Sequence, residues 1–495
     1  MLRPILALTP LLVIAGAIPT PLEPRVLLIT REQPQLSDLP SCLHSLGSYG
    51  SVSGSDQVFL ASKSCVDVEF ENLASGLVEG SMIPLDMDQS GSAASTESES
   101  SSRRLFWLGE AGVQGKVHVE GMDSPLLGVF EDVQNKADSL AGRSGLVQTA
   151  AQRILDVFAG RAPVQTSQVE RLYETSHSVI FSASDRLVPI LDTLIPSHLS
   201  LVALPDLNNL DSGLTNAFTG SVRKDLVDNL ANLTSQLKFS PKIDRILNEG
   251  LDDHQLVRDV RYLTGESSDL VSRHSFTGGA RQAAHWIRDI VQHTGAECLL
   301  EPFLPGFAPN VICTYPSLIQ NATGMTIMSA HYDSRGSFGK TRAPGGDDDG
   351  SGSGHLLGIA RAIGKQGVRF EKPVVLAFFA GEEQGLLGSH AYARQLSSEN
   401  ATVLLQVQAD MLGYRVANEP RQLGLPATIE TPEASWLIGN LSQIYSPELV
   451  VGRTAACCSD HQSFLGYNFP ATQVFERNDW IADPEYHSSG DLSMR

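Results

Sequence analysis

Residues 324–354 read GMTIMSAHYDSRGSFGKTRAPGGDDDGSGSG. An apolar stretch typical of a buried strand ends at His331, and three consecutive aspartates, Asp347 to Asp349, precede a helix expected from Gly352 to about Ile363. A solvated loop could contain such a run, but adjacent like charges repel one another, and the chain already has a net charge of −20. The stretch predicts a strand, an acidic turn and a helix.

The same alternation of strand and helix continues toward the C-terminus. PVVLAFFA (373–380) is predicted as a strand and 386–396 as a helix, and ATVLLQVQAD (401–410) is followed by a helix at 433–444. These strands are continuous apolar runs, as expected when helices cover both faces of a largely parallel sheet. The pattern favours an α/β fold, a three-layer αβα sandwich with a largely parallel mixed sheet.

Residues suited to bind metal follow each of these strands. The first strand ends at His331, the second is followed by Glu382 and Glu383, and the third ends at Asp410. The carboxyl ends of parallel strands meet at one edge of a sheet, where ligands bind. A single His or Asp after a strand is usually a helix cap or a turn residue. Several such residues at the ends of neighbouring strands are hard to explain as a set of caps. Imidazole and carboxylate groups without thiolates suit catalytic zinc, whose charge makes crowded carboxylates tolerable.

Six segments in this order resemble the secreted leucyl-aminopeptidase family of co-catalytic di-zinc exopeptidases. They are SAHYDSRG, PGGDDDGSGSG, FFAGEEQGLLGS, QADMLGY, SDHQSF and YHSSGD. The resemblance runs from about residue 251 to 491, roughly half of the chain, and it is specific as an ordered set, whereas GEE alone would mean nothing. It implies that 251–495 is a catalytic domain with the phosphorylase/hydrolase-like zinc peptidase fold.

The resemblance also implies a ligand set for two zinc ions per chain, consisting of His331, Asp348, Glu383, Asp410 and His487. Asp348 would bridge both ions, although the spacing alone does not choose it over Asp347 or Asp349. Asp333 would orient the ring of His331. Glu382 would be the general base for a water shared by the metals, which attacks the carbonyl of the N-terminal residue of a peptide or protein.

The sequence departs from this family in two places. Some relatives have a Tyr between two cysteines before SDH, where it could donate to the oxyanion, but this position is Ala456 here, so another donor or the metals alone would serve. Ser459 is interpreted as a helix cap and His461 as structural. The chain ends eight residues past His487, where relatives usually continue into a helix, so we expect the His487 loop to be less supported.

The N-terminal segment indicates secretion. Residues 1–17 combine an early Arg, a short apolar run and the small residues of Ala15-Gly16-Ala17, which is typical of a signal peptide, so we expect an extracellular glycoprotein. Sequons at Asn232, Asn321, Asn400 and Asn440 agree with this. The acidic balance argues against nucleic acid as a partner, and no stretch is long enough to predict a membrane span. We expect a monomer.

Six cysteines fit the oxidising environment that secretion implies. Closeness in sequence favours Cys42–Cys65 and Cys298–Cys313, out of 15 connectivities that six cysteines allow. Cys457 and Cys458 would then be either a vicinal pair or free thiols.

Residues 18–250 are predicted to form an α+β region. PRVLLIT (24–30), QVFLAS (57–62) and FWLGEAGVQGKVHVEG (106–121) are predicted as strands, and 126–159 has helical spacing. The Ser-rich segment 88–102 reads as a linker. Two interpretations remain open: a small α+β domain, or a pro-region that assists folding or covers an active site.

Two further functions use the same fold. One is a different reaction, either glutaminyl cyclisation on a single zinc or carboxypeptidase action; the complete two-metal ligand set disfavours the cyclase. The other is a non-catalytic binding domain on a decayed peptidase fold, which the intact ligand set also disfavours.

Overall fold

The structure is a computed structural model that describes residues 25–30, 42–51, 54–66, 68, 80–85, 103–114, 125–144, 168–175, 177–205, 222–337, 340, 342–456 and 458–493. The predicted signal peptide (1–17) and Ser-rich linker (88–102) lie outside these residues, as does the second part of the helix predicted at 126–159.

A six-stranded sheet forms the centre of the C-terminal half, in the order β16-β13-β11-β12-β10-β9. Its strands are β9 (Glu297–Glu301), β10 (Asn310–Tyr315), β11 (Met325–His331), β12 (Val374–Phe379), β13 (Val403–Ala409) and β16 (Ala471–Val474). Strands β16, β13, β11 and β12 are parallel, whereas β10 and β9 add antiparallel pairs at one edge. The largely parallel mixed sheet predicted from the apolar runs is confirmed.

Helices cover both faces of this sheet, which gives the predicted three layers. One face is covered by α6 (Asp253–Leu263), α7 (Gly278–Gln292) and α8 (Gly350–Gln366), whose apolar side chains form one core with the sheet. The other face is covered by α9 (Leu387–Ser398), α10 (Pro432–Tyr445) and α11 (His461–Gly466). On that side Phe379 of β12 packs against Tyr392 and Phe464. Two preceding helices extend this body, since α4 (Lys224–Gln236) contacts α10 and α5 (Pro241–Gly250) contacts α8.

The N-terminal region contains two antiparallel four-stranded sheets, ordered β2-β3-β1-β4 and β6-β7-β5-β8. The first contains β1 (Arg25–Thr30), β2 (Leu43–Ser51), β3 (Gly54–Ser62) and β4 (Gly80–Leu85). The second contains β5 (Arg103–Glu110), β6 (Val169–Glu174), β7 (Ser178–Ser184) and β8 (Leu199–Ala203). Helix α2 (Pro125–Ser144) packs on the second sheet, and two short 3₁₀ helices, Val188–Ile190 and Asp192–Leu194, lead into β8. A small parallel pair, β14 (Gln422–Pro426) and β15 (Val450–Thr454), completes the described strands.

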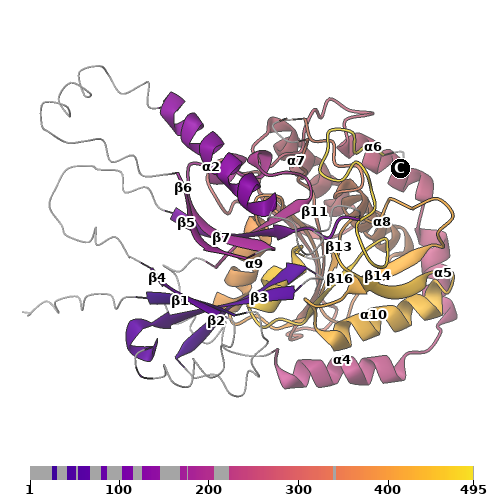
Figure 1. The fold of residues 1–495 in the computed structure, drawn as a ribbon. Helices are drawn as coiled ribbons and strands as arrows, with labels where there is room; N and C mark the ends of the chain where they lie inside the picture. The colour runs from indigo at the N-terminus through magenta and orange to yellow at the C-terminus, as the bar shows by residue number, and fades with distance from the viewer. Residues whose placement is uncertain are drawn as a thin grey trace, which may run out of the picture.

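The N-terminal sheets share their cores with the α/β body. Leu27 of β1 and Trp107 of β5 belong to the same buried cluster as Phe379 and Phe464. Figure 1 shows these N-terminal strands, in indigo and violet, lying beside α9. Burial of this apolar surface attaches the N-terminal region to one face of the α/β body.

The cysteine predictions are confirmed for two pairs. Cys42–Cys65 and Cys298–Cys313 are disulfides, and the second pair joins directly opposed residues of β9 and β10. Cys458 is also disulfide-bonded, so the free-thiol alternative is wrong for this residue. Within the described part of the chain, no helix combines the length and apolar character that crossing a bilayer requires.

Candidate metal centre

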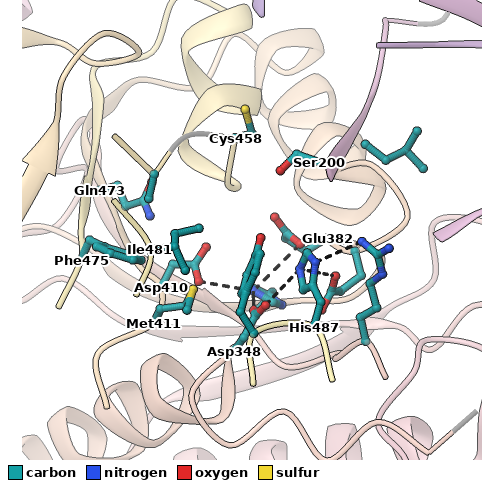
Figure 2. A pocket seen from close by; sticks show the side chains of 16 residues that line it. Ser200, Asp348, Glu382, Asp410, Met411, Cys458, Gln473, Phe475, Ile481 and His487 are labelled. Atoms are coloured by element: carbon teal, nitrogen blue, oxygen red, sulfur yellow. Dashed lines mark hydrogen bonds and ion pairs between the residues drawn. The ribbon is translucent and has the colours of Figure 1, made fainter. Parts of the chain in front are cut away.

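Neighbouring parallel strands bring the acidic and histidine residues together. Strand β11 ends in His331, Glu382 and Glu383 follow β12, and Asp410 follows β13. Because β13, β11 and β12 are adjacent and parallel, their carboxyl ends lie at one edge. Figure 2 shows the side chains of Asp348, Glu382, Asp410 and His487 directed into one pocket.

Asp348 lies between two imidazole rings. Its Oδ1 is 3.2 Å from Nε2 of His331, and its Oδ2 is 3.2 Å from Nε2 of His487. Asp410 Oδ1 is 3.6 Å from the same nitrogen of His331, and Glu383 Oε2 is 3.2 Å from that of His487. The donor atoms of Asp348, Glu383 and His487 lie within 4.8 Å of one another, and those of His331, Asp410 and Asp349 do the same. Asp348 also contacts His331, so it links these two donor sets.

The other two aspartates of the run have different partners. Asp349 caps α8, since its Oδ1 accepts the N–H of Gly352, and it also accepts the N–H groups of Met411 and His331. The donor atoms of Asp349, His331 and Asp410 also lie within 4.8 Å of one another, although three N–H bonds already use most of the acceptor capacity of the Asp349 carboxylate. Asp347 Oδ1 accepts the N–H of Gly413 at 2.8 Å. Of the three aspartates, Asp348 is the one whose described contacts include both imidazoles.

Two buried residues that the sequence did not single out hold the Asp loop in place. Asp491 accepts the N–H groups of Asp347 and Asp348, at 2.8 and 3.1 Å. Arg273, fully buried, donates to the carbonyls of Leu263, Tyr332, Pro344 and Gly345, and thus joins the loop after β11 to the loop before the Asp run. Asp491 falls in the quoted YHSSGD segment, whereas nothing in the sequence pointed to Arg273.

Asp333 and Glu382 lie beside the donor sets. Asp333 Oδ1 is 3.5 Å from Nδ1 of His331, and its Oδ2 accepts the hydroxyl of Ser275 at 2.9 Å. Glu382 Oε2 is 4.0 Å from Nε2 of His331, so it faces the donor sets from one side. The positions of both residues are compatible with the roles predicted for them.

Burial and crowding shift the protonation equilibria of the cluster. Burial raises the pKa of Glu382 well above its usual range, and the neighbouring Glu383 adds to this, against the effect of His331. Burial would lower the pKa of His331, but the Glu382 carboxylate and the nearby carboxylates of Asp333, Asp348 and Asp410 raise it well above normal. Burial opposes ionisation of Asp348, yet both imidazoles hold its pKa below the ordinary value. The site thus concentrates negative charge that a cation would stabilise.

The donor groups fit zinc. The oxygens and nitrogens come from carboxylates and imidazoles, and Cys458, which lines the same pocket, is in a disulfide and is therefore not a thiolate ligand. Glu383 Oε1 is buried and has no hydrogen-bond partner, as expected for an atom whose partner is a metal ion.

The pocket above the cluster combines an apolar side with polar groups. Met411, Ala456, Phe475 and Ile481 form the apolar side, part of which Figure 2 shows. Tyr486 also lines the pocket and stacks on the ring of His487, with 3.7 Å between ring centroids. Burial raises its pKa well above normal, so its hydroxyl stays protonated and can donate. Tyr486 falls in the quoted YHSSGD segment, but its side chain was not singled out from the sequence.

The interpretation of His461 as structural agrees with its contacts, because the buried ring lies 3.0 Å from the carbonyl of Ile429. The interpretation of Ser459 as a cap is wrong: its hydroxyl is buried without a hydrogen-bond partner, and α11 has no side-chain cap.

Comparisons with known proteins identify relatives of this half of the chain. Residues 310–495 match the model of peptidase family M28. A probable leucine aminopeptidase of Arthroderma otae is 29% identical over 251 residues, covering 49% of this chain and 67% of the relative. Leucine aminopeptidase 1 of Chaetomium globosum is 28% identical over 300 residues, covering 57% of this chain and 70% of the relative.

Two solved structures from Legionella pneumophila share the fold. LapB has a TM-score of 0.54 with 16% identity, covering 79% of this chain and 93% of that one. The LapA aminopeptidase has a TM-score of 0.50 with 16% identity, covering 79% and 92%. Because the identity is low, this likeness concerns the fold alone.

Proposed function

Because residues 310–495 match the model of peptidase family M28, we propose that this protein is a secreted, zinc-dependent aminopeptidase that removes the N-terminal residue of peptides. The observation that supports this most is the position of Asp348, whose two oxygens face His331 and His487 at 3.2 Å each. A carboxylate placed in this way suits a bridge between two cations.

In this proposal His331, Asp348 and Asp410 would hold one zinc ion, and Asp348, Glu383 and His487 would hold the other. Bound zinc would lower the pKa of a water molecule and polarise the scissile carbonyl. Glu382 takes the proton of the attacking water and passes it to the departing amine. Asp333 keeps the ring of His331 in position through its contact with Nδ1.

Tyr486 is the proposed donor to the oxyanion, in place of the Tyr that is absent at Ala456. Its ring is held against His487, and its hydroxyl keeps its proton at neutral pH because its pKa is raised. A hydroxyl donor in the pocket that contains the ligands would act where negative charge develops in the transition state.

The contacts of Arg335 favour an aminopeptidase over a carboxypeptidase. A carboxypeptidase needs a cationic side chain that is available to bind the C-terminal carboxylate of its substrate. Arg335 lines the pocket, but its guanidinium donates to the carbonyls of Ile195, Pro196 and Leu199. The surrounding carboxylates instead suit a positively charged α-amine. The apolar side chains of Met411, Phe475 and Ile481 suit an apolar N-terminal residue.

The test is hydrolysis of leucyl-nitroanilide by the wild-type protein and by Glu382→Gln, with and without a zinc chelator. We expect the chelator to abolish turnover and the variant to lose about 10²–10⁴-fold in kcat while it retains zinc. Full activity of the variant would reject Glu382 as the base. Cyclisation of an N-terminal glutamine without hydrolysis would favour the single-zinc cyclase instead.

A further inference from the structure

The second nitrogen of the His487 ring contacts the N-terminal region. Its Nε2 faces Asp348 and Glu383, whereas its Nδ1 lies 3.1 Å from the carbonyl oxygen of Ser197. Ser197 lies 290 residues earlier, two residues before β8. A neutral imidazole that binds a cation through Nε2 has its proton on Nδ1, and a carbonyl opposite that proton fixes both the tautomer and the ring orientation.

Arg335 connects the same N-terminal segment to the loop after β11. Its buried guanidinium donates to the carbonyl of Ile195 and to those of Pro196 and Leu199 at 3.3 and 3.5 Å. It also lies 3.1 Å from Nδ1 of His487. A guanidinium can only donate, so Arg335 cannot form a hydrogen bond with a protonated Nδ1. When a cation occupies Nε2, the partner of Nδ1 is therefore the Ser197 carbonyl. Arg335 then holds the chain segment that carries this carbonyl.

Further contacts anchor this segment on the other side of the site. Asp192 is fully buried and lies 3.0 Å from Nε2 of His274, which in turn is 3.3 Å from the amide of Gln384. The N–H of Ala203 donates to the carbonyl of Gly385 at 3.2 Å. Gln384 and Gly385 directly follow the predicted ligand Glu383. The N-terminal segment around Ser197 therefore contacts the loops of two predicted ligands, Glu383 and His487.

The same segment forms a wall of the substrate pocket. Ser200 and Leu201 of β8 line the pocket together with Glu382 and Met411. Figure 2 shows Ser200 on the far side of the opening from Asp348.

We propose that residues 192–201 of the N-terminal region are a permanent part of the active centre: the Ser197 carbonyl orients His487, Arg335 is the positioning residue that holds it there, and Ser200 and Leu201 bound the substrate pocket. This proposal rests on the proposed function, because it assigns a partner to one of the zinc ligands. It opposes the interpretation of this region as a pro-segment that is removed to uncover the site.

The first test compares Arg335→Met with Arg361→Met. This matched control removes a partly buried guanidinium of α8 that is paired with Asp259 of α6, outside the pocket. Zinc affinity is measured by chelator competition, and ligand geometry by the visible absorption of the cobalt-loaded protein. We expect Arg335→Met to bind zinc about 10–100-fold more weakly and to change the cobalt spectrum, whereas Arg361→Met, even if less stable, keeps both wild-type values. If Arg335→Met has the zinc affinity and the cobalt spectrum of the wild type, this inference is wrong but the proposed function is not affected. A wild-type protein that binds no zinc would refute the proposed function.

The second test addresses the pocket wall. Ser200→Trp should raise KM for leucyl-nitroanilide more than for alanyl-nitroanilide and leave zinc affinity unchanged, because the indole would fill space beside the substrate rather than touch a ligand. Equal changes in KM for the two substrates would contradict the assignment of Ser200 to the wall of the substrate pocket.

The third test is peptide mapping of the active, zinc-loaded protein under denaturing conditions. Residues 192–201 should be present in stoichiometric amount. Recovery of a fully active form that lacks them would overturn the proposal.

Discussion

The carboxylate of Asp491 accepts the backbone N–H of Asp348, with 3.1 Å between Oδ2 and the nitrogen. Its other oxygen accepts the N–H of Asp347, so one buried side chain fixes two consecutive residues of the acidic turn. The orientation of Asp348 between His331 and His487 therefore depends on a residue that contacts neither imidazole in the described hydrogen bonds.

Asp491→Asn tests this dependence. Asparagine has one acceptor oxygen, and its amide would face one of the two N–H groups as a second donor. We expect about 10–100-fold weaker zinc binding, measured by chelator competition. The control is Asp252→Asn, because Asp252 also accepts a backbone N–H, from Gln255, but does so at the exposed start of α6, outside the pocket. Wild-type affinity in Asp491→Asn would contradict this role.

Arg273→Lys should destabilise the fold. Lysine cannot replace the planar fork that donates to four carbonyls, so several buried oxygens would lose their partners. We expect the free energy of unfolding in urea to fall by on the order of 3 kcal/mol. Arg288→Lys, at a solvent-exposed pair with Asp289, should change it by about 0.5 kcal/mol or less. A similar small effect at Arg273 would show that its bonds do not stabilise the loops.

His461 should make stability depend on pH. Burial lowers its pKa from 6.5 to about 4, so the folded protein keeps the ring neutral where the unfolded chain would protonate it. Its contribution is therefore present above pH 6.5 and is lost as the pH falls toward 4, by roughly 3 kcal/mol. His461→Gln, whose amide can still donate to Ile429, should lose correspondingly less stability over this range. An equally steep loss in both proteins, measured by urea unfolding at each pH, would contradict the assignment.

Tyr486→Phe removes the proposed oxyanion donor and keeps the ring that stacks on His487. We expect kcat to fall about 10²-fold or more, with KM and zinc content little changed. A variant with wild-type kcat would mean that the metals or another group stabilise the oxyanion.

The sequence predicted the α/β half well because its strands are apolar runs and its ligand residues are side chains at the strand ends. His331, Glu382, Glu383 and Asp410 could be placed at one edge by topology alone. The choice of Asp348 within the acidic run could not, since it depends on which oxygens the N–H groups of Gly352 and Gly413 occupy.

The contribution of the N-terminal region could not be predicted from the sequence. Ile195, Pro196 and Ser197 act through main-chain carbonyls, which leave no residue-type signal, and their partners Arg335 and His487 lie more than a hundred residues away along the chain. The expectation of weaker support for the His487 loop overlooked these contacts.

The most direct test of the central claim is the zinc content of the purified protein and of Asp348→Ala, measured by mass spectrometry of the metal against protein concentration. The proposed bridging role predicts two zinc ions per wild-type chain and the loss of both in the variant. A wild-type chain that holds one ion or none, or a variant that keeps both, would contradict it.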